Sequence, residues 1–254
     1  MLSAEELSET ARIKGIKNKG YAEKDYILDI VLLLISRNTK DELVFKGGTC
    51  LYKFYKIARF SEDIDFTLKK EINIDSLLKL IISGLSAFGI EAEIKEKRMP
   101  YNSVLITMKA KGPLFMGTPQ SFCNIGIDIN LKSSIEIEPA NASYNSLYRD
   151  IPSFSLLIMG EKEIFAEKVR AIITRNKGRD VYDLWFLLER GVKADNALIE
   201  KKLAYYNMKF SISEFEKAIN AKKNAWEKDL APLVFGALPP FNEAKKKILS
   251  AFKK

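Results

Sequence analysis

The sequence of 254 residues predicts an α/β (α+β) protein, in which a mixed-sheet domain is followed by an all-helical C-terminal domain. Two observations predict this order. Up to about residue 155, hydrophobic residues recur at a spacing of two in some segments and at helical spacing in others, whereas only the helical period remains afterwards. The composition, with 47% hydrophobic and 29% charged residues, is that of a globular chain long enough to bury a core.

Helices and strands alternate in the first part of the chain. Five aliphatic residues between Ile27 and Ile35 share one helical face, and Asn73 or Asp75 can cap a later helix. Near Asp128, isoleucines alternate with polar residues, as in a strand with one apolar face. We expect helices at 24–38, 50–57 and 73–88, and strands at 43–45, 64–68, 90–97, 103–110 and 123–131.

The rest of the chain has helical periodicity. The polar segment 140–155, which contains Pro152, is the expected boundary and gives domains at 1–152 and 153–254. Gly178, Gly191 and the pair Pro239-Pro240 interrupt the pattern that follows. We expect helices at 161–175, 180–190, 195–205, 212–226 and 241–252.

The residue types present exclude several kinds of chemistry. Histidine is absent, which removes Ser-His-Asp and Cys-His nucleophile systems, histidine general bases and histidine-ligated zinc. Cys50 and Cys123 are too few for a disulfide scaffold, and neither has a neighbour at metal-ligand spacing. Any chemistry must use carboxylates, lysines, hydroxyls and bound metal.

The chain is basic, with 41 lysines and arginines against 33 acidic residues and a net charge of +8. Such a surplus favours polyanionic partners through counterion release, although a lysine-rich surface without such a partner is the alternative. The longest aliphatic run, Ile30 to Ile35, is far too short to span a bilayer, and the acidic N-terminus is unlike a signal peptide. We therefore expect a cytoplasmic protein with no membrane partner.

One segment gathers the residues that phosphate chemistry needs. Asp63 and Asp65 are two apart on a predicted strand, so both carboxylates lie on one face and can bind a hard cation. Asp128, on a neighbouring strand, could complete a site for Mg²⁺ (or Mn²⁺). Gly47 and Gly48 precede a helix, where a backbone without side chains can approach phosphate. Alternatively, the glycine turn is only a connection and the two aspartates belong to a solvated face.

The same segment resembles a known family. Residues 45–51 and 59–66 are similar to the first motif of the nucleotidyltransferase AbiEii/AbiGii toxin family, within the DNA polymerase β-like nucleotidyltransferase superfamily. Residues 166–171 and 179–184 resemble the family's later lysine and aspartate motifs. The resemblance implies a nucleotidyltransferase fold and a toxin that binds nucleoside triphosphate and adds nucleotides to the 3′ end of tRNA, which stops translation. It also implies a cognate antitoxin protein as a partner.

The resemblance assigns roles by motif position. Ser61 and Asp63 match the family's serine and first metal-binding aspartate, and Asp65 matches the second carboxylate. Lys168 matches the essential lysine, and Asp180 or Asp183 the late aspartate. Contacts with the nucleotide are also expected from four other residues of the first motif, namely Gly47, Gly48, Thr49 and Arg59.

Several of these residues have structural alternatives. Lys168 falls on a largely apolar helix stripe, where it can reach a triphosphate or simply pair with a carboxylate. Asp180 can instead be a helix N-cap with Asp183 at the third position, and Thr49 can cap a helix. Arg59 can bind phosphate bidentately or serve as the partner of a carboxylate.

These observations together predict a Mg²⁺-dependent nucleotidyltransferase with tRNA as the expected acceptor. Lys168 is expected to face the carboxylates from the helical domain and neutralise charge that develops on the phosphates. Two alternatives remain open: an enzyme that modifies a protein hydroxyl or a small molecule such as an antibiotic, and a non-catalytic module that binds nucleotide or a partner.

Overall fold

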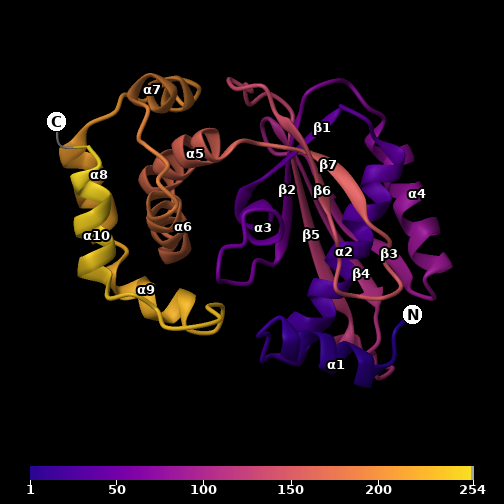
Figure 1. Cartoon of the computed structure of the whole chain (residues 1–254). Coiled ribbons are helices and arrows are strands. Elements are labelled where there is room, and N and C mark those ends of the chain that lie inside the picture. The colour runs from indigo at the N-terminus through magenta and orange to yellow at the C-terminus, as the bar shows by residue number, and fades with distance from the viewer. Residues whose placement is uncertain (253–254) are drawn as a thin grey trace. The chain divides into compact units, whose positions relative to one another are not determined.

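The computed structural model describes residues 1–252 of the chain and shows two compact units (Figure 1). Neither unit is a single continuous stretch, so the chain passes from one to the other five times. The first unit comprises Met1–Phe54, Phe60–Ser133 and Pro139–Ile158, and the second comprises Tyr55–Arg59, Ser134–Glu138 and the chain from Met159 onward.

The first unit is built on a seven-stranded mixed sheet of order β3-β4-β5-β2-β1-β7-β6. β1 is antiparallel to β2 and parallel to β7, and β2 is parallel to β5. The remaining neighbours pair antiparallel. The strands are β1 (Leu43–Lys46), β2 (Asp63–Leu68), β3 (Glu91–Arg98), β4 (Ser103–Lys111), β5 (Cys123–Asn130), β6 (Ala140–Tyr144) and β7 (Phe154–Ile158).

Helices supply the rest of the core of this unit. α2 packs against α4 and β5, and its residues from Ala22 to Ile35 are almost all buried, Lys24 being the exception. The side chain of Asn73 accepts a hydrogen bond from the backbone N–H of Ser76 and thereby caps α4. The helices are α1 (Ala4–Ile13), α2 (Lys19–Asn38), α3 (Gly47–Lys53) and α4 (Ile74–Ala87), and a short 3₁₀ helix, η1, spans Pro119–Ser121.

A buried polar network ties α2 to α3. The Lys53 ammonium, at the end of α3, lies 2.5 Å from both Asp25 Oδ1 and Asp29 Oδ1 of α2. Lys14 also pairs with Asp25, and the Tyr148 hydroxyl donates to Asp25 Oδ2 at 2.9 Å. Both carboxylates are fully buried, so these cations and the hydroxyl supply the partners that a buried charge requires.

The second unit is helical, and α5 and α6 pack together at its centre. Phe252 lies against three other rings, with centroid distances of 5.2 Å to Phe210, 5.2 Å to Phe215 and 6.3 Å to Phe165. The helices are α5 (Glu161–Thr174), α6 (Gly178–Glu189), α7 (Asn196–Ala204), α8 (Ile212–Asn220), α9 (Lys223–Leu230) and α10 (Phe241–Ser250).

The α/β (α+β) class with a helical C-terminal part is confirmed, and the structure corrects several details. Segment 140–155 contains β6 and the start of β7, so the last passage between the units follows Ile158 rather than residue 152. The helix expected at 212–226 is two helices, with a break at Ala221 and Lys222. α1 was not expected. Among the described residues, no helix combines the length and apolar character needed to cross a bilayer.

Candidate active site

The glycine pair lies at the bend from β1 into α3. Gly47 has a φ of +73°, a conformation that residues with a side chain rarely adopt, and it is the first residue of the helix. The buried Thr49 hydroxyl donates a hydrogen bond to the backbone carbonyl of Asp63, the first residue of β2. This contact fixes the bend against the start of the strand that carries the two predicted aspartates.

The three predicted carboxylates share one face of the sheet. Asp63 and Asp65 alternate with Ile64, which is fully buried on the opposite face. Asp65 and Asp128 are direct partners across the parallel β2–β5 pair, so their side chains leave the sheet on the same side. The predicted alternation thus places Asp63, Asp65 and Asp128 on a common surface.

Two glycines leave the space that these carboxylates fill. A Cβ at Gly47 would overlap the carboxylate of Asp65 and lie 2.8 Å from its Cγ. A Cβ at Gly126 would overlap Oδ1 of Asp63 in the same way. The glycine bend and the acidic strand are therefore one packed arrangement, in which backbone and carboxylate approach more closely than any side chain would allow.

The donor set fits a hard divalent cation in chemical type, because all three side chains offer carboxylate oxygens. The predicted convergence is not present, however: within residues 1–252, no three acidic or cysteine side chains are close enough together to hold a metal ion. Carboxylates repel one another, which accounts for the separation of three of them on one face.

Two further residues of this unit are neighbours of the carboxylates, Ser61 along the chain and Lys46 across the sheet. Ser61 is buried in the segment that leads into β2. Lys46, the last residue of β1, is buried and is the direct cross-strand partner of Asp65. The row therefore runs from Lys46 through Asp65 to Asp128, with a cation at one end. Lys46 is not among the predicted site residues, because a lysine before the glycines can equally well be a residue that merely ends the strand.

The predicted residues of the second unit form a separate ion network. Arg59 is 1% exposed and binds Asp183 of α6 with both Nε and a terminal amino group, each at 2.6 Å. The ammonium of Lys168, on α5, lies 2.6 Å from Asp183 Oδ2 and 2.9 Å from Asp180 Oδ1. Arg175 pairs with Asp180 at 2.7 and 2.8 Å. Three cations thus enclose two buried aspartates.

These cations determine the charge of the aspartates. Burial by itself would raise the pKa of Asp180, but Lys168 and Arg175 outweigh it and hold the pKa below its ordinary value. Burial likewise opposes ionisation of Asp183, and Arg59 and Lys168 outweigh it, so its pKa is also lowered. Both aspartates are therefore anions that hold Lys168 from two sides.

The geometry selects among the structural alternatives for these residues. Asp180 is not an N-cap: α6 is preceded by Lys177 as N-cap residue, and Asp180 is the third residue of the helix, with its carboxylate on Lys168 and Arg175. Arg59 makes the carboxylate contact that was the alternative to phosphate binding. Sequence reasoning missed Arg175, although a cation at the end of one helix and an aspartate in the next first turn form a recognisable pattern.

The fold of this chain is shared by proteins of known structure. Two solved structures share the fold: MenT4, a nucleotidyltransferase toxin of Mycobacterium tuberculosis H37Rv, with a TM-score of 0.68, and JHP933 of Helicobacter pylori, with 0.58. Each is 19% identical to this chain in sequence. The match covers 97% of this chain and 88% of MenT4, and 92% of this chain and 90% of JHP933.

The family follows from the sequence itself. Residues 33–249 match the family described as nucleotidyl transferase AbiEii toxin of type IV toxin–antitoxin systems, and the chain belongs to this family. No curated protein matches the chain. The family assignment confirms the resemblance of the two motifs, and it makes the protein a nucleotidyltransferase of toxin–antitoxin type.

Proposed function

We propose that this nucleotidyltransferase transfers a nucleoside monophosphate from a nucleoside triphosphate to an acceptor RNA, the 3′ end of tRNA, and thereby stops translation. The observation that carries the proposal is the pairing of Asp65 with Asp128 across β2 and β5, on the face where Gly47 packs against Asp65. Carboxylates on adjacent strands beside a bend free of side chains suit the binding of a metal-bound triphosphate.

The residues of the first unit would hold the triphosphate. Asp63, Asp65 and Asp128 would bind Mg²⁺ (or Mn²⁺), which when bound neutralises phosphate charge and lowers the pKa of the attacking hydroxyl. The backbone at Gly47 and Gly48 would lie against phosphate oxygens. Thr49 has its hydroxyl on Asp63, so its proposed part is to fix the bend. Ser61, buried next to β2, would contribute a hydroxyl to the same phosphates.

Lys168 is the proposed cation for the charge that develops during transfer. Asp180 and Asp183 hold its ammonium at 2.9 and 2.6 Å, and the side chain is 8% exposed, so its position is fixed in advance. A preorganised donor of this kind is worth about 3 kcal/mol in transition-state stabilisation. Arg59 donates two hydrogen bonds to the carboxylate of Asp183. It would therefore act as a positioning residue for Asp183 rather than as a phosphate ligand.

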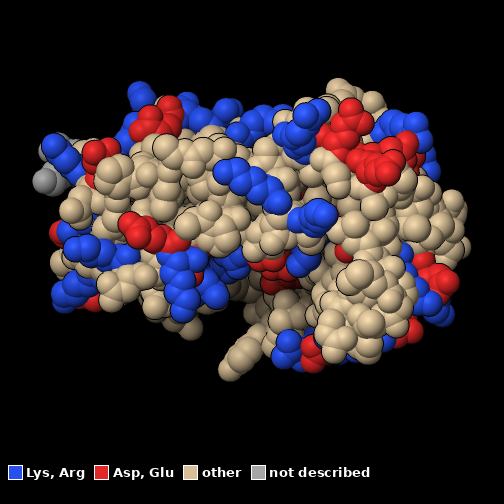
Figure 2. All heavy atoms as spheres, turned by 90° about the horizontal axis from the view of Figure 1, so that it is seen from below, with Lys and Arg blue, Asp and Glu red and all other residues tan. Residues whose placement is uncertain are grey.

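The partners of the reaction follow from charge and from the family. A net charge of +8 favours a polyanionic acceptor such as tRNA. Figure 2 shows lysines and arginines in several groups on one face, mixed with acidic side chains, so the surplus forms no single stripe there. A cognate antitoxin protein is the second expected partner, because type IV toxin–antitoxin systems define the family.

The test is transfer of label from each of the four nucleoside triphosphates, radiolabelled at the α-phosphate, to total tRNA in the presence of Mg²⁺. We expect one or more nucleotides to label tRNA-sized product, and Asp63→Asn to reduce the rate at least about a hundredfold. Asp75→Asn is the matched control, since Asp75 is exposed on α4 and, within residues 1–252, pairs with Lys97 alone.

The mobility of the labelled product distinguishes the alternatives. Label on a protein band would indicate that the acceptor is a protein hydroxyl, and freely diffusing label would indicate a small molecule. The proposed activity would be contradicted if none of these acceptors were labelled and wild type and Asp63→Asn behaved identically. The remaining hypothesis would then be a non-catalytic module that binds nucleotide or a partner.

A further inference from the structure

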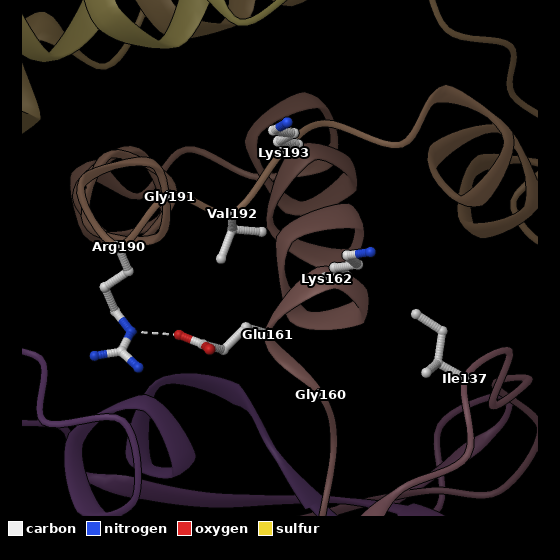
Figure 3. A pocket seen from close by; sticks show the side chains of 8 residues that line it. All are labelled: Ile137, Gly160, Glu161, Lys162, Arg190, Gly191, Val192 and Lys193. Atoms are coloured by element: carbon white, nitrogen blue, oxygen red, sulfur yellow. Dashed lines mark hydrogen bonds and ion pairs between the residues drawn. The ribbon is translucent and has the colours of Figure 1, made fainter.

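The second unit contains a pocket that the proposed reaction does not use. It lies where α5 begins and α6 ends, and it has a volume of about 550 Å³. Figure 3 shows Glu161 and Lys162 reaching it from the start of α5, and Arg190 from the end of α6. Ile137 and Val192 supply the apolar part of its wall, and all its lining residues belong to this unit.

The pocket carries a positive charge that the protein does not neutralise. Three cations line it, Lys162, Arg190 and Lys193, against the single carboxylate of Glu161. In the part of the chain that the structure describes, neither Lys162 nor Lys193 has an acidic partner, and both are exposed. Elsewhere in this unit, lysines pair frequently, as Lys201 does with Glu136 and Lys247 with Glu189.

Arg190 is held in a defined orientation. Its Nε binds Glu161, and its guanidinium lies 5.9 Å from the ring centroid of Tyr55 and 5.6 Å from that of Phe186. Contacts with two rings and one carboxylate orient the planar group without using its terminal amino groups, which have no acceptor among the described residues. A phosphate oxygen could accept from them at little cost in side-chain entropy.

Helix dipoles explain only part of this arrangement. Glu161 in the first turn of α5 and Arg190 at the end of α6 each complement the helix terminus at which they lie, and their ion pair joins the two ends. That pair is electrically neutral. Lys162, however, is in the first turn of α5, where a cation is unfavourable, so the dipole does not account for it.

We propose that this pocket binds phosphate groups of a polynucleotide, as a site for the backbone of the acceptor RNA. Two unneutralised lysines with an oriented arginine supply the charge, and Ile137 and Val192 offer an apolar surface to a sugar or base. The inference rests on the proposed function for the identity of the RNA as acceptor. The phosphate chemistry of the pocket does not depend on it.

The test measures binding of a single-stranded RNA of about 20 nucleotides, without nucleoside triphosphate, as a function of salt. Losing two phosphate contacts in Lys162→Gln/Lys193→Gln should lower the slope of log K against log[salt] by about 1.4 and weaken binding about twentyfold at about 0.1 M salt. Glu161→Gln, which removes the acidic side chain from the residues that line the pocket, should strengthen binding instead. The controls change the same charges outside the pocket: Lys228→Gln/Lys246→Gln and Glu216→Gln.

Each outcome has a definite meaning. RNA binding that falls equally in both lysine double variants would overturn the proposal, because it would show a response to net charge alone. A loss of triphosphate binding rather than RNA binding would also overturn it, since the phosphate would then belong to the nucleotide. Binding is measured without transfer, so an intact RNA effect in a protein that transfers nothing would reject the proposed reaction and keep this site.

Discussion

At the scale of single residues, the conformation of Gly47 is essential to the site. Its φ of +73° and the overlap of any Cβ with Asp65 mean that Gly47→Ala must move either the bend or the carboxylate. We expect this variant to lose transfer activity at least about tenfold beyond its effect on stability of about 1 kcal/mol.

Gly117→Ala is the matched control for this prediction. Gly117 has a φ of +78° in the same unit, but a Cβ there meets nothing within 4 Å. The substitution therefore costs similar backbone strain and should leave transfer intact. Equal activity of the two variants in rate assays, once each has been corrected for folded fraction, would show that Asp65 does not depend on the bend.

Arg59 makes a second prediction at this scale. It is fully buried on Asp183, whose cationic partners among the described residues are Arg59 and Lys168, so Arg59→Met would leave that carboxylate with Lys168 alone. Removing one partner of a buried pair costs about 3 kcal/mol or more. We expect this loss in urea unfolding, against less than about 1 kcal/mol for Arg149→Met, whose side chain is 77% exposed and pairs with Glu6. A loss as small as the control's would mean that Lys168 suffices for Asp183.

The sequence predicted part of the site because alternation along a strand is a local property. Asp63 and Asp65 could be assigned to one face from spacing alone, whereas Asp128 joins that face through the register of β2 and β5. Arg59 and Asp183 are 124 residues apart, so their contact depends on the tertiary fold rather than on any local pattern. The place of Lys46 beside Asp65 likewise depends on the β1–β2 register, whereas Arg175 is only five residues from Asp180 and could have been found from the local pattern.

At the scale of elements, the two ends of α3 are stabilised by different interactions. Packing fixes its start, where Gly47 meets Asp65, and buried charge fixes its end, where Lys53 meets Asp25 and Asp29. Burial opposes ionisation of Asp25, but Lys53 and Lys14 outweigh it and lower its pKa to about 2. The charged form of this carboxylate therefore stabilises the end of α3.

The lowered pKa of Asp25 gives a dependence of stability on pH. A group whose pKa is lower in the folded state stabilises the fold above its ordinary pKa and loses that contribution as the pH falls through the folded value. The free energy of unfolding should therefore decline between about pH 4 and pH 2, by on the order of 2 kcal/mol for Asp25. Asp180 and Asp183 act in the same direction.

Urea unfolding at a series of pH values measures this decline. Asp25→Asn should lower stability at neutral pH and flatten the decline, because the asparagine cannot titrate. Asp75→Asn, at an exposed position of the same unit, should leave the slope as in the wild type. A wild-type curve that stays level from about pH 4 to pH 2 would contradict the role of the buried aspartates.

Elements that lack a strong local pattern were the ones missed. β6, of sequence Ala-Asn-Ala-Ser-Tyr, is an edge strand with small polar residues, and only its pairing with β7 makes it a strand. α1 did carry a signal: Ser3 and Glu6 form a capping box, and both reciprocal hydrogen bonds are present. The break between α8 and α9 contains neither glycine nor proline, so no helix-breaking residue predicts it.

At the scale of the whole molecule, the helical unit depends on two short segments from the first part of the chain. Glu163 is fully buried and accepts hydrogen bonds from the backbone N–H groups of Glu136 and Ile137, each at 2.9 Å. Lys202 donates to Ser134 O at 2.6 Å and to Glu163 at 2.5 Å. Segment 55–59 supplies Arg59 to Asp183.

A fragment of residues 159–254 should therefore fail to fold cooperatively, although it contains all six helices α5 to α10. It would leave Asp183 without Arg59, and Glu163 without the amides that it caps, each a buried polar group short of a partner. Far-UV circular dichroism and urea unfolding of the fragment test this. A sharp two-state transition with wild-type helix content would contradict it.

The five passages of the chain between the units have a consequence for how the protein can be divided and recombined. Exchanging the helical unit with that of a relative would require three separate stretches to be transplanted at once, whereas a single crossover at residue 152 or 158 would yield mismatched interiors. The chain is consequently expected to tolerate recombination with a relative only when all of these stretches are exchanged together.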